Sequence, residues 1–377
     1  MDFELNEDQR AIAEMAGSLM SDYCTDECLR DWDLSGQPYM QALWASCIET
    51  GLHALAIPEA AGGSGLGMTE LIQVLDAQGG ALAQVPLWRH QLAAATLAQF
   101  GGTALQPWVE QAAAGTGLLT VTLDGLTSVR GIELQASAEG ADWRLRGRVA
   151  ALALAEQSAA ALVLALVQGQ PRLVLLDLAQ AGISRVPGTM THGEAFADLH
   201  LDGALLSHSH VLPEAALGWL APRAIAALAA LQLGVSAEQV HRTVAYIGER
   251  QQFDRPIGSF QAVQMSMADS HVQLEVLRSA LWQLCYRLDA GLAAPSEALA
   301  TAYLACEAGH RIGHAAQHVH GGIGVDLTYP IHRFLYWSRG LASALGGSSV
   351  ILERLGDWLN DNDTLGWKYD LEEHQAL

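Results

Sequence analysis

One stretch in the last third of the chain carries residues suited to holding a phosphate-bearing ligand. Residues 249–261 read ERQQFDRPIGSFQ, and the pattern predicts that one helix ends at Arg250 and another begins near Ser259. An arginine can bind a pyrophosphate through two parallel hydrogen bonds. Phe253 can stack on a ring, and the amide of Gln261 can contact a polar edge. The same residues could instead form an ordinary joint between helices with an exposed arginine.

A second stretch could bring backbone amides close to the same kind of ligand. The residues HGGIG at 320–324 follow a long helical pattern. Alone, such a turn is a helix C-cap, but successive N–H groups in a glycine-rich turn can also bind anions. Gly321, Gly322 and Gly324 are therefore candidate ligand-binding residues.

Three histidines, His310, His314 and His318, recur every fourth residue and would share one face of the preceding helix. Histidines at this spacing can bind one metal ion. No carboxylate accompanies them at the spacing of a zinc-enzyme helix, so packing or solvent contact is the favoured interpretation. The sequence predicts no metal site.

The elements that must position these residues fall into consecutive regions. Residues 1–115 have apolar residues at helical spacing, residues 116–212 have short alternating apolar runs between turns, and residues 213–363 return to long helical patterns. This order predicts an α+β protein with an N-terminal helical domain, a middle antiparallel sheet or small barrel, and a C-terminal helical bundle. Residues 364–377 are polar and are predicted to form a tail.

Composition excludes several classes of function. Half of the 377 residues are hydrophobic, and the net charge is −21, the opposite of the basic surface that nucleic acid requires. The five cysteines are an odd number in helical-looking segments, which predicts free thiols and a reducing compartment, the cytoplasm. We expect no membrane span, because no apolar run reaches the roughly 18 residues that cross a bilayer.

Three blocks of sequence resemble the acyl-CoA dehydrogenase family. RQQFDRPIGSFQAVQMSMAD at 250–269 is similar to the family's R-x-x-F-G-x-x-I-x-x-F-Q signature. AQHVHGGIGVDLTYPIHRF at 316–334 resembles its Q-x-x-GG-x-G segment, and GLHALAIPEAAGGSGLG at 51–67 resembles its N-terminal glycine-rich block. The blocks keep the family's order and spacing, so the resemblance spans nearly the whole chain.

The resemblance implies an FAD-dependent oxidoreductase that converts an acyl-CoA thioester to its 2,3-enoyl form. In this family a carboxylate removes the α-proton while a hydride leaves the β-carbon for the flavin. The isoalloxazine lies beside the sheet domain of one subunit, and the adenosine-diphosphate arm reaches the neighbouring subunit. An electron-transfer flavoprotein is the usual electron acceptor, so it is an expected partner here.

Carried over residue by residue, the resemblance assigns seven residues to the adenosine-diphosphate arm of FAD. They are Arg250, Phe253, Gln261, His318, Gly321, Gly322 and Gly324. His318 stands where the motif usually has glutamine, and it keeps the ability to donate or accept a hydrogen bond. Asp254 replaces the glycine that usually follows the phenylalanine, which is expected to alter the turn.

The catalytic base that the resemblance leads us to expect is absent. Many members carry it in a Tyr-Glu-Gly-Thr segment, but the matching residues at 345–348 read LGGS and place Gly346 at the glutamate position. Other members carry it on the first long helix of the third region, where Arg223 stands. The nearby Glu214 and Glu238 lie too far along that helical pattern. We therefore assign no catalytic residue.

Contacts to the flavin ring are also reduced. Active members usually carry a T-E-x-x-x-G-S-D-like stretch and a G-x-K-x-W-I-T-like stretch in the sheet domain. The corresponding residues read TVTLDGLTSVRG at 120–131 and GRVAALA at 147–153. The tryptophan and the expected hydroxyl contacts to the ring are missing. The chain is expected to offer a half-site to a partner's FAD and to lack much of its own.

This asymmetry favours a non-catalytic, half-site subunit of a heteromeric acyl-CoA dehydrogenase, such as a heterotetramer, that desaturates a bulky acyl-CoA, for example a steroid-derived one. A sibling chain would supply the glutamate. Three alternatives stay open: a self-sufficient dehydrogenase with an atypical base such as Glu59, a lyase-like relative acting on a CoA thioester without redox chemistry, and a CoA-binding protein without flavin.

Overall fold

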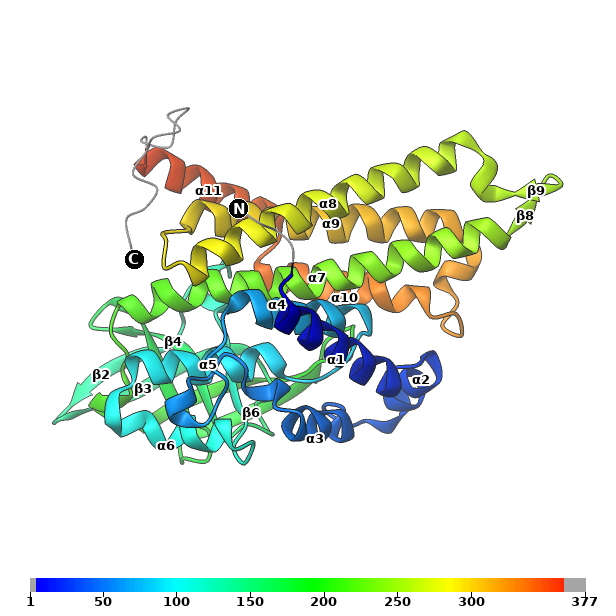
Figure 1. Cartoon of the computed structure of the whole chain (residues 1–377). Coiled ribbons are helices and arrows are strands. Elements are labelled where there is room, and N and C mark those ends of the chain that lie inside the picture. Colours follow the sequence, from blue (N-terminus) through cyan, green and yellow to red (C-terminus); the bar gives the residue numbers. More distant parts are fainter. Residues whose placement is uncertain (1–4, 363–377) are drawn as a thin grey trace. The chain divides into compact units, whose positions relative to one another are not determined.

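The computed structural model describes residues 5–362 (Figure 1). Its helices are α1 (Glu7–Tyr23), α2 (Asp26–Ser35), α3 (Gln41–Glu49), α4 (Met68–Gly80), α5 (Leu87–Phe100), α6 (Gly102–Ala113), α7 (Ala215–Glu249), α8 (Gln261–Asp289), α9 (Pro295–His320), α10 (Ile331–Leu345) and α11 (Ser348–Asp361). Short 3-10 helices are η1 (Leu52–Ala54), η2 (Glu59–Ala61), η3 (Asp124–Leu126), η4 (His208–His210), η5 (Ile257–Ser259) and η6 (Gly321–Val325).

The strands are β1 (Leu119–Val121), β2 (Gln135–Glu139), β3 (Asp142–Ala153), β4 (Ala160–Val167), β5 (Gln170–Asp177), β6 (Ile183–Thr189), β7 (Ala195–Leu206), β8 (Gln251–Gln252) and β9 (Arg255–Pro256). Helices come first, then the strands of the main sheet, then long helices, as Figure 1 shows by colour. The predicted α+β class and this order are confirmed.

The chain divides into two compact units, each assembled from separate segments. The helical unit comprises residues 5–31, 68–83 and 225–362 of the described structure. The sheet unit comprises residues 32–67 and 84–224. The domain limits predicted after residues 115, 212 and 363 stay a prediction, and the predicted tail at 364–377 lies outside the described residues.

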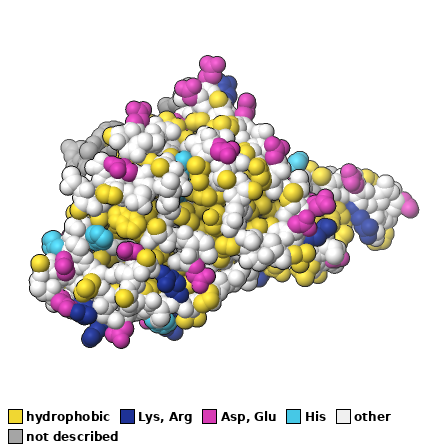
Figure 2. All heavy atoms as spheres, turned by 90° about the horizontal axis from the view of Figure 1, so that it is seen from below, with side chains coloured by type: hydrophobic (Ala, Val, Ile, Leu, Met, Phe, Trp, Pro, Cys, Tyr) yellow, Lys and Arg dark blue, Asp and Glu magenta, His cyan; other side chains and the backbone are white. Residues whose placement is uncertain are grey.

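The surface carries the excess of acidic residues that the composition requires. The chain has 41 Asp and Glu residues against 20 Lys and Arg residues. Figure 2 shows acidic side chains scattered over the visible face, with basic side chains gathered at a few points among them. On this face of the described structure, no basic stripe of the kind that binds nucleic acid is visible.

The sheet unit contains a seven-stranded sheet in the order β1-β4-β2-β3-β7-β6, with β5 paired to β4 outside this path. Strands β1 and β2 run parallel to β4, whereas the remaining pairs are antiparallel. The sheet is therefore mixed, and the prediction of a purely antiparallel sheet is wrong. Alternation of apolar residues indicates strands and their faces, but it does not fix the direction in which they pair.

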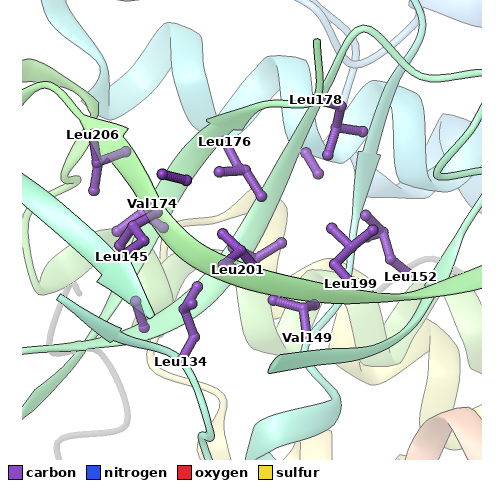
Figure 3. Close-up of a cluster of buried hydrophobic side chains, with 14 of the residues drawn as sticks. Leu134, Leu145, Val149, Leu152, Val174, Leu176, Leu178, Leu199, Leu201 and Leu206 are labelled. Carbon is purple, nitrogen blue, oxygen red and sulfur yellow. The ribbon is translucent and has the colours of Figure 1, made fainter. Parts of the chain in front are cut away.

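One face of this sheet forms the core of the unit. Figure 3 shows Leu145 and Val149 of β3 lying close to Leu199 and Leu201 of β7, all within one buried apolar cluster. The pairing of β3 with β7 shifts register twice, after Leu145 and after Val149. Such bulges re-aim the side chains beside them, and here they flank a polar segment of β3.

Close backbone contact joins α4 to α7 in the helical unit. A Cβ atom on Gly79 would lie 2.1 Å from the carbonyl oxygen of Leu231, and one on Gly234 would lie 1.9 Å from that of Asp76. Real side chains do not approach a carbonyl oxygen so closely, so only glycine allows the two helices to meet at this distance.

A carboxylate at the end of α8 caps the beginning of α4. Asp289 accepts hydrogen bonds from the backbone N–H groups of Met68 and Thr69, at 2.7 and 2.9 Å, and from the Thr69 hydroxyl at 2.5 Å. The first amides of a helix have no partner inside it and carry partial positive charge. The carboxylate therefore stabilises α4 and ties it to α8.

Helix α7 is long and apolar enough, by length and composition, to cross a membrane. Among the described residues it is the one helix that meets this test, which corrects the expectation that no run was long enough. Its most apolar 18-residue window has a mean hydropathy of 1.4, and 72% of that window is buried inside the structure. Core helices of folded domains share these properties.

Two buried imidazoles connect α6 to its neighbours in the sheet unit. His90 accepts the N–H of Leu119 at Nδ1, so Nε2 carries the proton and donates to the carbonyl of Ala112 at 3.1 Å. Nε2 of His53 lies 2.9 Å from the carbonyl oxygen of Ala113. Burial, together with the neighbouring His53, lowers the pKa of His90 to about 3. His90 is therefore neutral in the folded chain at ordinary pH.

Replacing Asp289 with Ala should lower the free energy of unfolding by about 1–2 kcal/mol, because the first amides of α4 lose their cap. Urea denaturation measures the change. The same replacement at Asp269, an exposed residue of the same helix, is the control and should change stability by less than about 0.5 kcal/mol. Equal effects at the two positions would contradict the cap.

The free energy of unfolding should fall as the pH falls from about 6.5 towards 3, because the unfolded His90 binds a proton that the folded one does not. His90→Gln should reduce this slope by up to about 1.4 kcal/mol per pH unit. His271→Gln, at an exposed position, should leave the slope unchanged. A slope that is the same in all three proteins would show that His90 is not the group responsible.

Candidate functional site

The seven predicted ligand-binding residues all lie in the helical unit. Arg250, Phe253 and Gln261 occupy the connection between α7 and α8, while His318 and the glycines occupy the end of α9 and η6. The rings of Tyr246 and His320 stack with centroids 4.3 Å apart. Since one ring is in the last turn of α7 and the other ends α9, this contact brings the two groups of predicted residues together.

The connection between α7 and α8 is a small β-hairpin, which the sequence did not predict. Strands β8 and β9 pair Gln252 with Arg255, and the N–H of Ile257 donates to the carbonyl of Arg250 at 2.8 Å. Phe253 and Asp254 form the two-residue turn with φ of 54° and 62°. Both are left-handed, a conformation that favours glycine or asparagine. The expected alteration at Asp254 is therefore a strained turn rather than a different path.

The hairpin presents an apolar tip to solvent. Phe253 is 85% exposed, and its ring lies 6.2 Å from that of Phe260. The guanidinium of Arg255 stacks over Phe260 at 4.1 Å. A large exposed aromatic side chain held on a strained turn suits contact with another molecule.

The beginning of α8 offers donors for an anion. Phe260 is its N-cap and provides no side-chain cap, so the first amides of the helix point outward without a side-chain acceptor. Helix N-termini of this kind attract phosphate groups. Gln261 is the first residue of α8, Arg250 lies in the connection that precedes it, and both side chains are exposed. Their chemistry fits the diphosphate of the FAD arm that the resemblance implies.

The glycine turn after α9 is open on one side and tight on the other. A Cβ atom on Gly321 or Gly322 would meet nothing within 4 Å, so a ligand can approach the backbone there. A Cβ atom on Gly324 would lie 2.7 Å from Oε1 of Gln317, so a larger residue there would displace the glutamine side chain. The turn therefore has an accessible backbone at Gly321 and Gly322, and the side chain of Gln317 packs against it at Gly324.

Two residues beneath this turn were missed by sequence reasoning. Nε2 of Gln317 and Nε2 of His320 are buried and have no hydrogen-bond partner in the described structure. Nδ1 of His320 lies 2.8 Å from the carbonyl oxygen of Ala316. Their position inside the block at 316–334 was visible in the sequence, but nothing in the sequence showed that their nitrogens would be unpartnered. Such atoms fit a site that a ligand or water completes.

The position expected to carry the catalytic base is a helix C-cap. Gly346 ends α10 with φ of 94°, and the N–H of Gly347 donates to the carbonyl of Ala342 at 2.9 Å. Gly347 is also left-handed, with φ of 80°. This turn contains no side chain that could remove a proton.

Other places considered for a base hold paired or unsuitable groups. Arg223 stacks over the ring of Trp219 at 4.0 Å and donates to its carbonyl oxygen. Glu214 pairs with Arg172 and Glu238 with Arg242. The structure thus adds no carboxylate at either expected place.

In the sheet unit, a cluster of charges occupies the region that matches the flavin-ring contacts. Asp198 accepts the N–H of Ala151 at 2.8 Å and pairs with Arg148, which also lies 3.6 Å from Glu133. Burial acts to raise the pKa of Asp198. The hydrogen bonds from Ala151 and Arg148 act in the opposite direction and hold this pKa below its ordinary value. Ala151 is left-handed, with φ of 47°.

The hollow beside this cluster is too small for a ring system. It measures ≈ 20 Å³ and lies between the loop at Thr122–Gly125 and the segment at Arg148–Ala150. A space of that size holds about one water molecule. This hollow therefore offers no platform for an isoalloxazine; a larger one of ≈ 660 Å³, also lined by Glu133 and Arg148, lies towards Ile183 and His200.

The three histidines of α9 are exposed along the helix, and the rings of His310 and His314 lie 4.6 Å apart. Among residues 5–362, no group of three or more His, Cys, Asp or Glu side chains could hold a metal ion. The predicted absence of a metal remains a prediction.

Comparison with known proteins finds two matching families. Residues 6–116 match the family described as acyl-CoA dehydrogenase, N-terminal domain, and residues 223–359 match acyl-CoA dehydrogenase, C-terminal domain. The acyl-CoA dehydrogenase FadE27 of Mycobacterium tuberculosis is 35% identical over 377 residues, which cover 94% of this chain and 98% of FadE27.

Two solved structures are similar over nearly the whole chain. A chain of the ChsE4-ChsE5 complex from Mycobacterium tuberculosis has a TM-score of 0.91 and 33% identity, covering 96% of this chain and 99% of that one. A chain of a Tcur3481-Tcur3483 steroid ACAD variant has a TM-score of 0.90 and 35% identity, covering 95% of this chain and 99% of that one.

Replacing Asp254 with Gly should raise the free energy of unfolding by about 0.5–1 kcal/mol, because glycine adopts the left-handed turn without strain. Asp254→Val should lower it by about 1 kcal/mol or more, since a β-branched residue resists that conformation. Urea denaturation of the three proteins checks the order. A valine variant as stable as the glycine variant would show that the turn is not strained.

Proposed function

Because the chain belongs to the acyl-CoA dehydrogenase family of FAD-dependent oxidoreductases, we propose that it is the base-less, half-site subunit of a heteromeric member. In this proposal a sibling chain carries the glutamate, and the pair α,β-desaturates a bulky acyl-CoA thioester. One observation carries the proposal: Gly346, the residue aligned with the catalytic glutamate, is a left-handed helix cap without a side chain.

The retained half-site supports a role in holding a partner's cofactor. Arg250 and the first amides of α8 would hold the diphosphate of FAD, and the open side of Gly321 and Gly322 would let the arm lie against the backbone. When bound in the pair, FAD would supply the acceptor for the hydride that leaves the β-carbon of the substrate. The residues of this chain bind and orient the arm and move no proton.

The reduced contacts to the flavin ring support the part of the proposal in which the sibling chain, and not this one, holds that ring. Ala151 and Ala153 stand at the positions where the family has tryptophan and threonine, and Asp198 and Arg148 satisfy each other beside them. A ligand that needed either of these partly exposed side chains would have to compete with this ion pair. The flavin ring is therefore expected to rest on the sheet of the sibling.

An exposed apolar stripe on α8 supports contact with a second chain. Met265, Val272 and Val276 are 60%, 56% and 41% exposed and share one face of the helix. Apolar residues of this kind mark interaction surfaces when they are contiguous. They lie on the helix whose first residues belong to the half-site, so a partner docked there could bring its cofactor to Arg250.

We base our proposal for the substrate and for the electron acceptor on similar proteins. One similar solved structure is described as a steroid ACAD, and another is a complex of two named chains. We accordingly propose a steroid-derived acyl-CoA for the pair and an electron-transfer flavoprotein as the acceptor. None of the five cysteines forms a disulfide, which fits the cytoplasmic compartment that we also propose.

The deciding experiment compares absorbance between 350 and 500 nm for the chain purified alone and for the chain co-expressed with a glutamate-bearing sibling. We expect no bound flavin in the chain alone and one FAD per pair in the complex. The complex should desaturate the acyl-CoA, and replacing the sibling's glutamate with glutamine should abolish turnover. Flavin in the lone chain that an acyl-CoA bleaches would overturn the proposal.

Arg250→Ala in the complex should weaken FAD binding about 10–100-fold, because a charge-assisted hydrogen bond contributes roughly 1.5–3 kcal/mol. FAD retained after ultrafiltration measures the loss. Arg30→Ala removes the same charge from an exposed site of the helical unit and should leave retention within about twofold. If both variants retain FAD equally, Arg250 does not contact the arm.

A further inference from the structure

A row of buried polar side chains runs along α7 inside the helical unit. Its members recur at helical spacing and so share one face of the helix. They are Gln232, Ser236, Gln239 and Thr243, each at most 1% exposed. We call this row the polar seam. Buried polar side chains in folded proteins nearly always have hydrogen-bond partners, so each member of the seam needs one.

The polar seam faces α9, which lies beside α7 (Figure 1). A Cβ atom on Gly309 would lie 2.6 Å from Oε1 of Gln232. Further along both helices, a Cβ atom on Gly313 would lie 4.0 Å from Oε1 of Gln239. The two helices therefore run in the same direction, and their contact ends at the stacked rings beside the glycine turn. The seam thus leads from the middle of the helical unit to the candidate half-site.

The two glutamines of the seam differ in their hydrogen bonds. Nε2 of Gln232 donates to the hydroxyl oxygens of Ser236 and Ser338, at 2.8 and 3.0 Å. The side chain of Gln239 is fully buried, and neither its Nε2 nor its Oε1 has a partner in the described structure. Exchanging the two amide atoms would not change this. Since an unpaired buried amide costs its full desolvation penalty, the site calls for a molecule that both donates and accepts.

Two more unpartnered nitrogens lie further along the same contact, on α9. Nε2 of Gln317 is a donor. Nδ1 of His320 lies 2.8 Å from the carbonyl oxygen of Ala316, and burial lowers the pKa of this imidazole. His320 is therefore neutral with its proton on Nδ1, which leaves the unpartnered Nε2 as an acceptor. The seam and the turn together present donors and acceptors of both kinds.

The spacing of these groups suits water. Gln317 lies one helical turn beyond Gly313, which is about 5.4 Å along the axis of α9. A single water molecule that bonds two groups spans about 5–6 Å between them. Buried water molecules in proteins typically have two to four polar partners, and Gln239, Gln317 and His320 can supply them.

We propose that buried water molecules join Gln239 to Gln317 and His320, and that Gln239 is thereby a positioning residue for the half-site. Water accepts from Gln317 and donates to His320, and the amide of Gln239 completes the network. Gln317 packs against Gly324, and His320 directly precedes Gly321. The water molecules therefore hold the two residues that support the turn. This role rests on the proposed function, in which the turn holds the FAD arm.

A crystal structure of the purified protein, alone or in its complex, at a resolution that shows ordered water tests the network directly. We expect electron density within hydrogen-bond distance of the Gln239 amide and of Nε2 of Gln317 or His320. A seam without such density would overturn the proposal.

Stability gives a second test, because the two arrangements predict opposite signs. Gln239→Met keeps the length of the side chain and removes both polar ends. With water present, it should lower the urea midpoint by roughly 0.3–1 M, since the water loses partners and Gln317 is left unpaired. In a dry seam it would raise the midpoint by removing an unpaired amide, and that result would overturn the proposal. Gln283→Met, at an exposed position of α8, should leave the midpoint unchanged.

The positioning role is tested by FAD retained after ultrafiltration of the complex with the sibling. Gln239→Met should weaken retention about fivefold or more. Asp289→Ala destabilises the helical unit at the opposite end of α8 from the half-site and should keep retention within about twofold. Equal losses in the two variants would reduce the effect to stability and overturn the positioning role. A wild-type complex without FAD would overturn the proposed function and this role with it, while the density and the midpoint would still decide the water.

Discussion

The face-to-face contact of Tyr246 with His320 is the interaction on which the candidate half-site depends. It joins the last turn of α7 to the last residue of α9, and Tyr329 lies against both rings, at 6.3 and 5.5 Å. Together with the packing of α8 against α9, this aromatic cluster sets the spacing between Arg250 and the glycine turn. Stacked rings are well suited to this task because they fix both distance and orientation.

The sheet unit shows the opposite arrangement, in which polar groups satisfy one another. Arg148 is surrounded by Asp198 and Glu133, with Asp124 close enough to raise its pKa further. Three carboxylates around one guanidinium leave an acidic surface, which suits neither a flavin ring nor the phosphates of CoA. The two places therefore differ: the end of α7 and the start of α8 leave donors open at the surface, whereas the groups of this charge cluster pair with one another.

The class of fold and the family could be predicted from the sequence because both depend on local residue patterns, which can be read without knowing how side chains pack. The helical spacing before residue 115 and the glycine of the turn at Gly321 are local signals. The direction of β1 and β2 against β4 is not local, since it depends on connections elsewhere. The hairpin at Phe253 was hidden because its turn lacks the usual Asn-Gly pair.

Other features could not be predicted because they depend on residues far apart in the chain. Asp289 caps a helix 220 residues earlier, and nothing near it in the sequence indicates a cap. The unpartnered nitrogens of Gln317 and His320 are visible only once burial is known. The candidate site residues were found by motif, and their roles as contacts to a cofactor arm remain proposals.

The glycine at position 346 has a consequence for how this chain can change over time. A glutamate placed there would have to adopt a left-handed backbone, at a cost of roughly 1–2 kcal/mol, or the end of α10 would have to rebuild. A single Gly346→Glu replacement would therefore cost stability at the end of α10 whether or not the new carboxylate reached a substrate.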